Sequence, residues 1–287
     1  MQVRFPRIDY SRVRPDWAPN REFASDRNAS STIPTYIEPY LIKVMNRAKD
    51  ALPDSAVELR KAIEVFNLQE GQHTRQHSAF NRRIREFYPE MLQLELKLKA
   101  DLQRFTETRS LRFNLAYCEG FESLGPPAAK LWFEHSEGLL EGADYEAVAL
   151  WKWHMAEEFE HRDVCYRTYK TLYAKGLFGQ LGFGWLYRVY GFLVVFIHLG
   201  AYTKSVRNCM LAQDRSRMTT AELAQSHRNL QAVSKLAIRR FLPALLPVLS
   251  PFYDPAKKRP PLGMAAYLAR FEKGADMGRD DPAPAVG

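Results

Sequence analysis

Apolar residues recur every three or four positions along most of the first 176 residues, which is the spacing of one face of an α-helix. Four long segments share this spacing: residues 31–52, 53–87, 89–125 and 143–176. Their ends carry helix signals, such as Asp144 at the start of the fourth segment and Gly125 at the end of the third. The sequence has no sustained alternation of apolar and polar residues and no Asn-Gly or Asp-Gly pair typical of hairpins. The pattern therefore predicts an all-α protein built on a four-helix bundle.

The rest of the chain differs from these four segments in composition. Residues 1–30 are rich in Arg, Pro, Asp and Asn without helical spacing, so we expect an N-terminal arm that lies over the fold. Residues 31–176 would form the bundle, and 177–273 would form additional C-terminal helices, apolar and basic, that pack on it. The last residues, 274–287, have the composition of a disordered tail.

The segment 181–202, LGFGWLYRVYGFLVVFIHLGAY, is strongly apolar but contains Arg188 and His198. The run after Arg188 is shorter than the ~20 residues that a transmembrane helix needs. Two interpretations stay open at this point. The segment is either a helix that covers the bundle or a helix that makes peripheral contact with a membrane through its apolar face.

Charge and cysteine content narrow the classes of function. The chain carries 41 Lys and Arg against 33 Asp and Glu, a formal net charge of +8. The surplus comes mostly from the C-terminal half, where it suits an anionic membrane or a solvated basic surface. No nucleic-acid-binding motif accompanies it, so we expect no nucleic-acid partner. The three cysteines are far apart and predict neither a disulfide framework nor a thiolate zinc site. The N-terminus lacks an apolar signal run, so we expect a cytoplasmic protein that is membrane-associated only if 181–202 contacts lipid.

Two of the predicted helices each place one Glu and two His on a single face, because offsets of three, four and seven return to the same side of a helix. The two sets are Glu70, His73 and His77, and His154, Glu158 and His161. Each set contains a Glu-x-x-His pair. Two such pairs on alternate helices are the ligand arrangement of ferritin-like dinuclear carboxylate proteins, in which the other two helices each add a glutamate. Glu38 and Glu119 are the candidates for these positions, with Glu122 as the alternative to Glu119.

The chemistry of these residue types favours a pair of hard metal ions. Carboxylates bridge two close cations and cancel their charge, and imidazole nitrogens complete the coordination. Such ligands suit iron best, with manganese or zinc as alternatives. The expected metal ligands are Glu38, Glu70, His73, His77, Glu119, His154, Glu158 and His161. Among them, the residues expected to act in catalysis are Glu70, Glu158, His77 and His154. From spacing alone, His77 and His154 are extra ligands, proton carriers or packed histidines.

Around these residues the chain resembles a bacterial family known as predicted metal-dependent hydrolases. The matching stretches are LQEGQHTRQHSAFN, residues 68–81, and WKWHMAEEFEHRDVCY, residues 151–166. The resemblance implies that His77 and His154 belong to the family's motif. The first helix departs from the family, because Glu38 stands in IPTYIEPY rather than in a Pro-x-Gly-Glu context. The third helix departs as well, because Glu119 lies between Cys118 and Gly120 rather than in a Leu-Glu-His setting.

The ligand set is more typical of oxygen-using di-iron enzymes than of hydrolases. We therefore expect an O2-dependent oxidase or oxygenase that acts on an apolar or amphipathic small molecule and takes electrons from a separate donor. The first alternative is a hydrolase that uses a metal-activated bridging water. Metal storage and a non-catalytic, membrane-peripheral interaction protein are further alternatives. A homodimer is compatible with the sequence.

Overall fold

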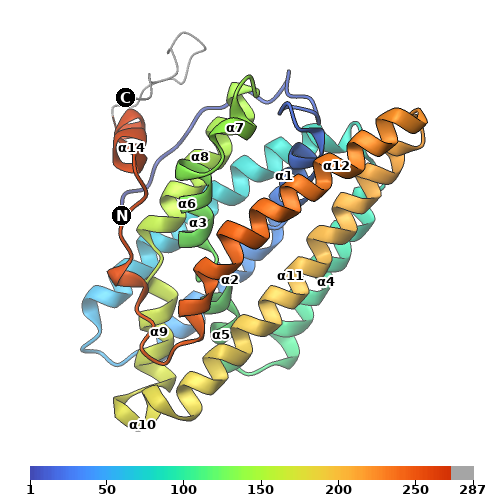
Figure 1. Ribbon diagram of the computed structural model, residues 1–287. Helices are drawn as coiled ribbons and strands as arrows, with labels where there is room; N and C mark the ends of the chain where they lie inside the picture. The colour runs from blue at the N-terminus through green and yellow to red at the C-terminus, as the bar shows by residue number, and fades with distance from the viewer. Residues whose placement is uncertain (273–287) are drawn as a thin grey trace.

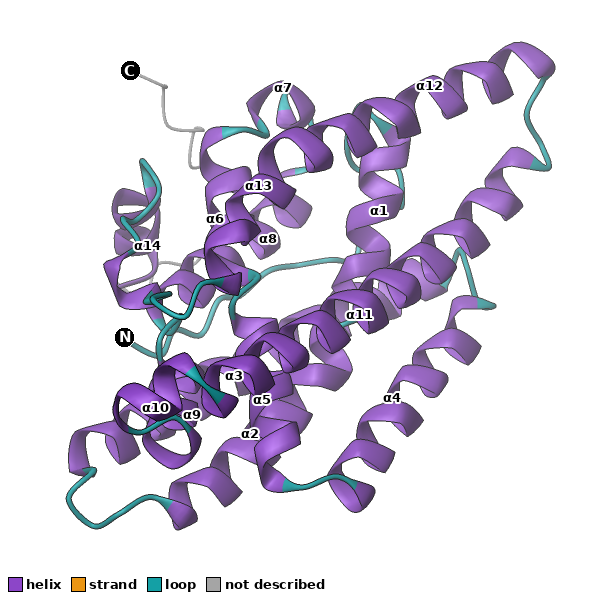
Figure 2. Cartoon of the chain, turned by 60° about the horizontal axis from the view of Figure 1, so that its bottom comes forward, coloured by secondary structure: helices purple, strands orange, loops and turns teal. Residues whose placement is uncertain are grey.

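The computed structural model describes residues 1–272, which form helices and connecting loops and contain no strand (Figures 1 and 2). The all-α prediction is confirmed. In chain order the elements are α1 (Arg21–Ser31), α2 (Pro34–Ala51), α3 (Val57–Arg85), α4 (Met91–Thr108), α5 (Leu111–Glu122), α6 (Gly125–Glu134), α7 (Glu137–Leu140), α8 (Tyr145–Glu160), α9 (Val164–Tyr173), α10 (Gly176–Leu181), α11 (Phe183–Arg215), α12 (Thr220–Leu236), η1 (Ala237–Phe241), α13 (Leu242–Leu245), η2 (Leu246–Leu249), η3 (Pro255–Lys257) and α14 (Met264–Glu272). The tail predicted for 274–287 lies outside the described residues.

Two of the four predicted helices are each divided in the structure. The third becomes α4 and α5, because Ser110 adopts extended backbone and its hydroxyl accepts a hydrogen bond from the Phe113 amide, which starts a new helix. The fourth becomes α8 and α9, with a turn at residues 161–163. The breaks leave α2, α3, α5 and α8 as the helices that carry the candidate residues.

The N-terminal arm is shorter than the sequence predicts. Residues 1–20 lack regular helix, but Arg21–Ser31 form α1, which begins where the Asn20 side chain accepts a hydrogen bond from the Phe23 amide. This helix has little amphipathic spacing, because it is buried on several sides rather than along one stripe. The interpretation of 1–30 as an arm is therefore wrong for its last ten residues.

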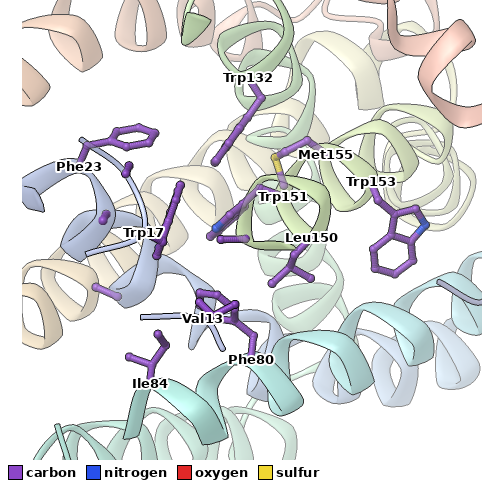
Figure 3. Close-up of a cluster of buried hydrophobic side chains, with 14 of the residues drawn as sticks. Val13, Trp17, Phe23, Phe80, Ile84, Trp132, Leu150, Trp151, Trp153 and Met155 are labelled. Carbon is purple, nitrogen blue, oxygen red and sulfur yellow. The ribbon is translucent and has the colours of Figure 1, made fainter. Parts of the chain in front are cut away.

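A first hydrophobic cluster joins the arm and α1 to α3, α6 and α8 (Figure 3). Trp151 on α8 stacks on Trp132 of α6, with ring centroids 5.4 Å apart, and Trp17 packs at the edge of Phe23. Figure 3 shows Trp151 and Trp153 on opposite sides of α8, with Trp151 on the side of Trp17. A second cluster joins α2, α3, α5, α9 and α11. The polar residues of the candidate site contact both clusters, as described below.

The long helix α11 packs along α5 and also contacts α1 and α4. The next helix, α12, turns back from the end of α11 and packs on α1 (Figures 1 and 2). The α5–α11 crossing is close, because two glycines replace larger side chains. A Cβ at Gly191 would lie 2.6 Å from the carbonyl oxygen of Ala116, and one at Gly120 would lie 2.7 Å from the Phe192 Cα. This contact fixes which side of α5 faces α11.

Candidate metal centre

Six of the predicted ligands converge in the interior, where each is at most 2% exposed. They form two overlapping groups: Glu38, His73, His154 and Glu158, and Glu70, His73, Glu158 and His161. Within each group the candidate ligand atoms lie within 4.8 Å of one another. The six side chains come from α2, α3, α8 and the residue that follows α8. The groups share His73 and Glu158, as expected of two neighbouring ion positions joined by a carboxylate.

Several buried atoms of this cluster have no hydrogen-bond partner among the described residues. They are Glu38 Oε1, both carboxylate oxygens of Glu70, His73 Nδ1 and His161 Nε2. Glu70 lies between the two rings, with Oε2 3.5 Å from His73 Nδ1 and Oε1 3.5 Å from His161 Nε2. An unsatisfied buried polar group costs about 1–3 kcal/mol. Five such atoms that face one another therefore fit coordination to metal ions, which would satisfy them together.

Burial and the charges of neighbouring groups shift the pKa values of the clustered carboxylates strongly. Burial, and then the nearby Glu70, raise the pKa of Glu38 well above its ordinary value, and burial raises the pKa of Glu70 to about 7. Burial also acts to raise the pKa of Glu158, but the adjacent His161 and His154 lower it to about 2. Without added positive charge the site holds some of its carboxyl groups protonated. Divalent cations would supply that charge and favour the ionised ligands.

The ring of His73 is oriented by a chain of contacts that reaches the N-terminal arm. Its Nε2 lies 3.1 Å from Glu157 Oε2, and Arg4 donates a hydrogen bond of 3.0 Å to the other oxygen of Glu157. Arg4 also bonds to Glu160, at 2.8 and 3.0 Å. With Nε2 engaged in this way, His73 directs Nδ1 into the cluster. No spacing signal in the sequence links Arg4 to residues 150 positions away.

His77, predicted as a ligand, lies outside both groups. Its Nε2 is 2.7 Å from His154 Nδ1, and its Nδ1 is 2.8 Å from the hydroxyl oxygen of Ser31. The other nitrogen of His154, Nε2, is 2.9 Å from Glu158 Oε1 inside the cluster. His77 therefore lies behind His154, one helical turn further along α3 than His73. It also packs against Trp151, with ring centroids 5.2 Å apart.

On the third helix, the structure brings Glu122 to the cluster and directs Glu119 away from it. Glu119 Oε1 accepts hydrogen bonds from Arg188 at 3.2 Å and from Ser123 at 3.1 Å. Glu122 Oε2 instead lies 2.9 Å from His161 Nδ1. The prediction of Glu119 as a ligand does not match this arrangement, because α11 packs on the side of α5 that carries Glu119. Arg188, a charge within an apolar segment, was the signal that a buried acidic partner was needed.

Aromatic rings from both hydrophobic clusters enclose the site. The ring of Phe66 lies 4.9 Å from that of His161, and Trp153 lies 4.9 Å from His73, both edge to face. Phe66 belongs to the second cluster and Trp153 to the first. The cluster of ligands thus occupies the junction between the two, where apolar walls exclude water and strengthen electrostatic interactions.

Comparison with known proteins gives one finding. A family model described as predicted metal-dependent hydrolase matches residues 2–259. No curated protein and no solved structure matches the chain. The match confirms the resemblance carried by the two Glu and His motifs. It contradicts the prediction of an O2-dependent oxidase or oxygenase, and with it the preference for an oxidoreductase that takes electrons from a donor. That prediction rested on a ligand set that hydrolytic and oxidative centres share, and the hydrolase alternative fits the match better.

Proposed function

We propose, because the chain belongs to the family of predicted metal-dependent hydrolases, that it hydrolyses a small-molecule substrate at a centre of two divalent metal ions. One observation carries the proposal: the buried cluster of carboxylate and imidazole groups, five of whose ligand atoms face one another without a hydrogen-bond partner among the described residues. The family match points to hydrolysis, and the cluster points to where it takes place. Iron and manganese are the ions that we propose to test first, followed by zinc, because the ligands are oxygen and imidazole nitrogen.

The two overlapping groups suggest how the ligands divide. One ion would be held by Glu38 and His154, and the other by Glu70 and His161, while His73 belongs to both groups and could serve either ion. Glu158 also belongs to both groups and would be available to both ions. Such ions, when bound, supply a water of lowered pKa as nucleophile and stabilise negative charge that develops on a substrate oxygen. Nothing in this assignment requires Glu119, which is paired with Arg188.

Each of the three histidines in the cluster has its second nitrogen on a protein acceptor, which is the arrangement that orients metal-binding imidazoles. His73 would donate from Nε2 to Glu157, and His161 from Nδ1 to Glu122. His154 would donate from Nδ1 to His77 Nε2, so that its Nε2, 2.9 Å from Glu158 Oε1, would face an ion together with that carboxylate oxygen. In all three, the nitrogen without a proton then points into the cluster.

The same assignment gives His77 and Ser31 a role in holding protons. If His154 Nδ1 donates to His77 Nε2, the His77 proton is on Nδ1 and is donated to the Ser31 hydroxyl oxygen. Burial, and then the neighbouring His154, lower the pKa of His77 well below its ordinary value, so this ring stays neutral. The chain of hydrogen bonds from Ser31 through His77 can therefore fix the tautomer of His154 without a positive charge on His77.

The test begins with the purified chain, stripped of metal by a chelator and reloaded with Fe(II), Mn(II) or Zn(II). We expect about two ions per chain and metal-dependent hydrolysis of at least one member of a panel of esters, amides and phosphate esters, at equal rates with and without oxygen. Hydrolysis in ¹⁸O-labelled water should place the label in the product.

Glu70→Ala should abolish tight metal binding, because it removes a carboxylate that lies between both ring nitrogens. Glu64→Ala is the matched control, because Glu64 lies on the same helix with a side chain that is 59% exposed. Equal metal content in the two variants, or turnover that depends on oxygen, would contradict the proposal.

A further inference from the structure

An apolar stripe runs along the outer side of α11. Five exposed residues recur at the three- and four-residue spacing of one helix face: Phe183, Leu186, Tyr190, Leu193 and Ile197. The stripe begins beside α10, where Phe178 is 94% exposed. Contiguous exposed apolar surface of this kind marks an interaction site more often than an isolated exposed leucine does.

A second apolar strip lies next to the first. It consists of Ile238, Leu242, Leu246 and Leu249, all exposed, from η1, α13 and η2. The Trp185 side chain on α11 donates a hydrogen bond of 2.9 Å to the Leu249 carbonyl oxygen, and Phe192 packs with Leu245 and Val248. The two strips therefore belong to neighbouring segments of the fold, and we call them together the apolar face.

The opposite side of α11 is fixed inside the protein. Among the described residues, the helical region Gly176–Arg215 is the one long and apolar enough to cross a membrane by length and composition, yet only 28% of its most apolar stretch is buried. The buried side includes Gly191, in close contact with Ala116, and Arg188, paired with Glu119. A membrane-spanning position would surround this ion pair and the α5 contact with lipid. The geometry instead suits a helix that lies along a surface with its outer stripe in contact.

The charge around the apolar face is strongly positive. Residues 176–250 contain nine Lys and Arg against two Asp and Glu, so this quarter of the chain accounts for most of the net charge of +8. Lys204 continues the α11 stripe two turns beyond Ile197, and Arg239 and Arg240 directly follow Ile238. All three cations are exposed, and none of them forms an ion pair within the described part of the chain. They remain available to an anionic partner.

We propose that the apolar face is a docking surface for an anionic lipid bilayer. The apolar stripe would enter the boundary between headgroups and acyl chains, and the flanking cations would lie at the level of the lipid phosphates. A second copy of the chain is a poorer occupant, because two strongly basic faces would be brought together. This inference goes beyond the proposed hydrolysis and stands without it, since neither the face nor its cations contribute to the metal centre.

The test is flotation of the full-length protein with unilamellar vesicles of phosphatidylcholine alone or with about a quarter of phosphatidylglycerol. We expect flotation with the anionic vesicles, weak or no flotation with the neutral ones, and release as salt is raised, because screening weakens attraction to the surface. Each Lys or Arg near an anionic surface contributes about fivefold to the partition coefficient. Arg239→Ala with Arg240→Ala should therefore lower it by about twenty-five-fold.

Polar substitutions of the apolar residues distinguish insertion into the bilayer from charge attraction to its surface. Leu193→Asn with Ile197→Asn should lower the partition coefficient at least tenfold and leave the melting temperature almost unchanged, because both side chains are exposed. Leu68→Asn is the matched control, an exposed leucine on α3 outside the apolar face. Equal binding to neutral vesicles, no binding to either, or unchanged binding by the variants would overturn the proposal. So would a protein-concentration-dependent dimer that the Leu193 and Ile197 changes abolish.

Discussion

Glu119 and Glu122 lie three residues apart on α5, yet replacing each by alanine should have different effects. The Glu119 change should lower stability, and the Glu122 change should lower metal affinity. Glu119→Ala removes the partner of Arg188, whose side chain is only 5% exposed. Loss of one member of a buried ion pair costs about 3–5 kcal/mol, because the other charge is left without compensation. For a chain of this size that corresponds to a fall in melting temperature of about 5–8 °C. Metal content should be unchanged, since Glu119 lies outside both ligand groups.

Glu122→Ala should have the opposite pattern. It removes the acceptor 2.9 Å from His161 Nδ1 and frees that ring to rotate. Loss of a carboxylate that orients a metal-binding histidine lowers metal affinity about 10–100-fold. The effect on stability in excess metal should be smaller than for Glu119→Ala, because no buried charge loses its only charged partner.

Both variants are compared with the original chain by urea unfolding in excess metal and by competition with a chromophoric chelator. Adding Arg188→Met to Glu119→Ala should restore part of the lost stability, because the pair is then replaced by uncharged groups. If Glu119→Ala lowers metal affinity tenfold or more while Glu122→Ala leaves it unaltered, our interpretation of α5 is wrong.

Three further predictions concern the metal, the arm and the α5–α11 contact. Removing metal should lower the free energy of unfolding by about 2.7 kcal/mol for each ion bound, relative to protein held at 100 times the dissociation constant, as measured by urea titration with and without chelator. An unchanged midpoint would argue against binding to the folded state. Arg4→Ala should lower metal affinity about tenfold, because Arg4 holds Glu157 against His73. Arg7→Ala is the control and should leave the affinity unchanged; chelator competition measures the affinity of both variants. Gly191→Val should destabilise the protein by about 1–3 kcal/mol, because its Cβ would meet the Ala116 backbone 2.6 Å away, and full stability would refute the close crossing.

Helical spacing was enough to predict α2, α3 and α8 and the paired Glu and His residues on them. Offsets of three and four on one helix depend only on helix geometry, so Glu70 with His73 follows from the sequence. Helix geometry does not show at which level along the helix the ligands end. His77 lies on the same face as His73 but one turn further along, where the ligand layer has ended and His154 takes its place.

Contacts between distant segments set the features that the sequence did not reveal. The rotation of α5, which brings Glu122 rather than Glu119 to the cluster, depends on where α11 packs. The role of Arg4 depends on the path of an arm without periodic spacing. The class of reaction was also beyond reach, because the same carboxylates and imidazoles serve oxidative and hydrolytic centres; the family match favours the hydrolytic alternative.

Anomalous diffraction from crystals grown with Mn(II) tests the central claim most directly. We predict two neighbouring peaks in the interior, one beside Glu38 and His154 and the other beside Glu70 and His161, with Glu158 between them. A chain whose six clustered side chains show no peak, or whose ions bind only at the surface, would contradict it.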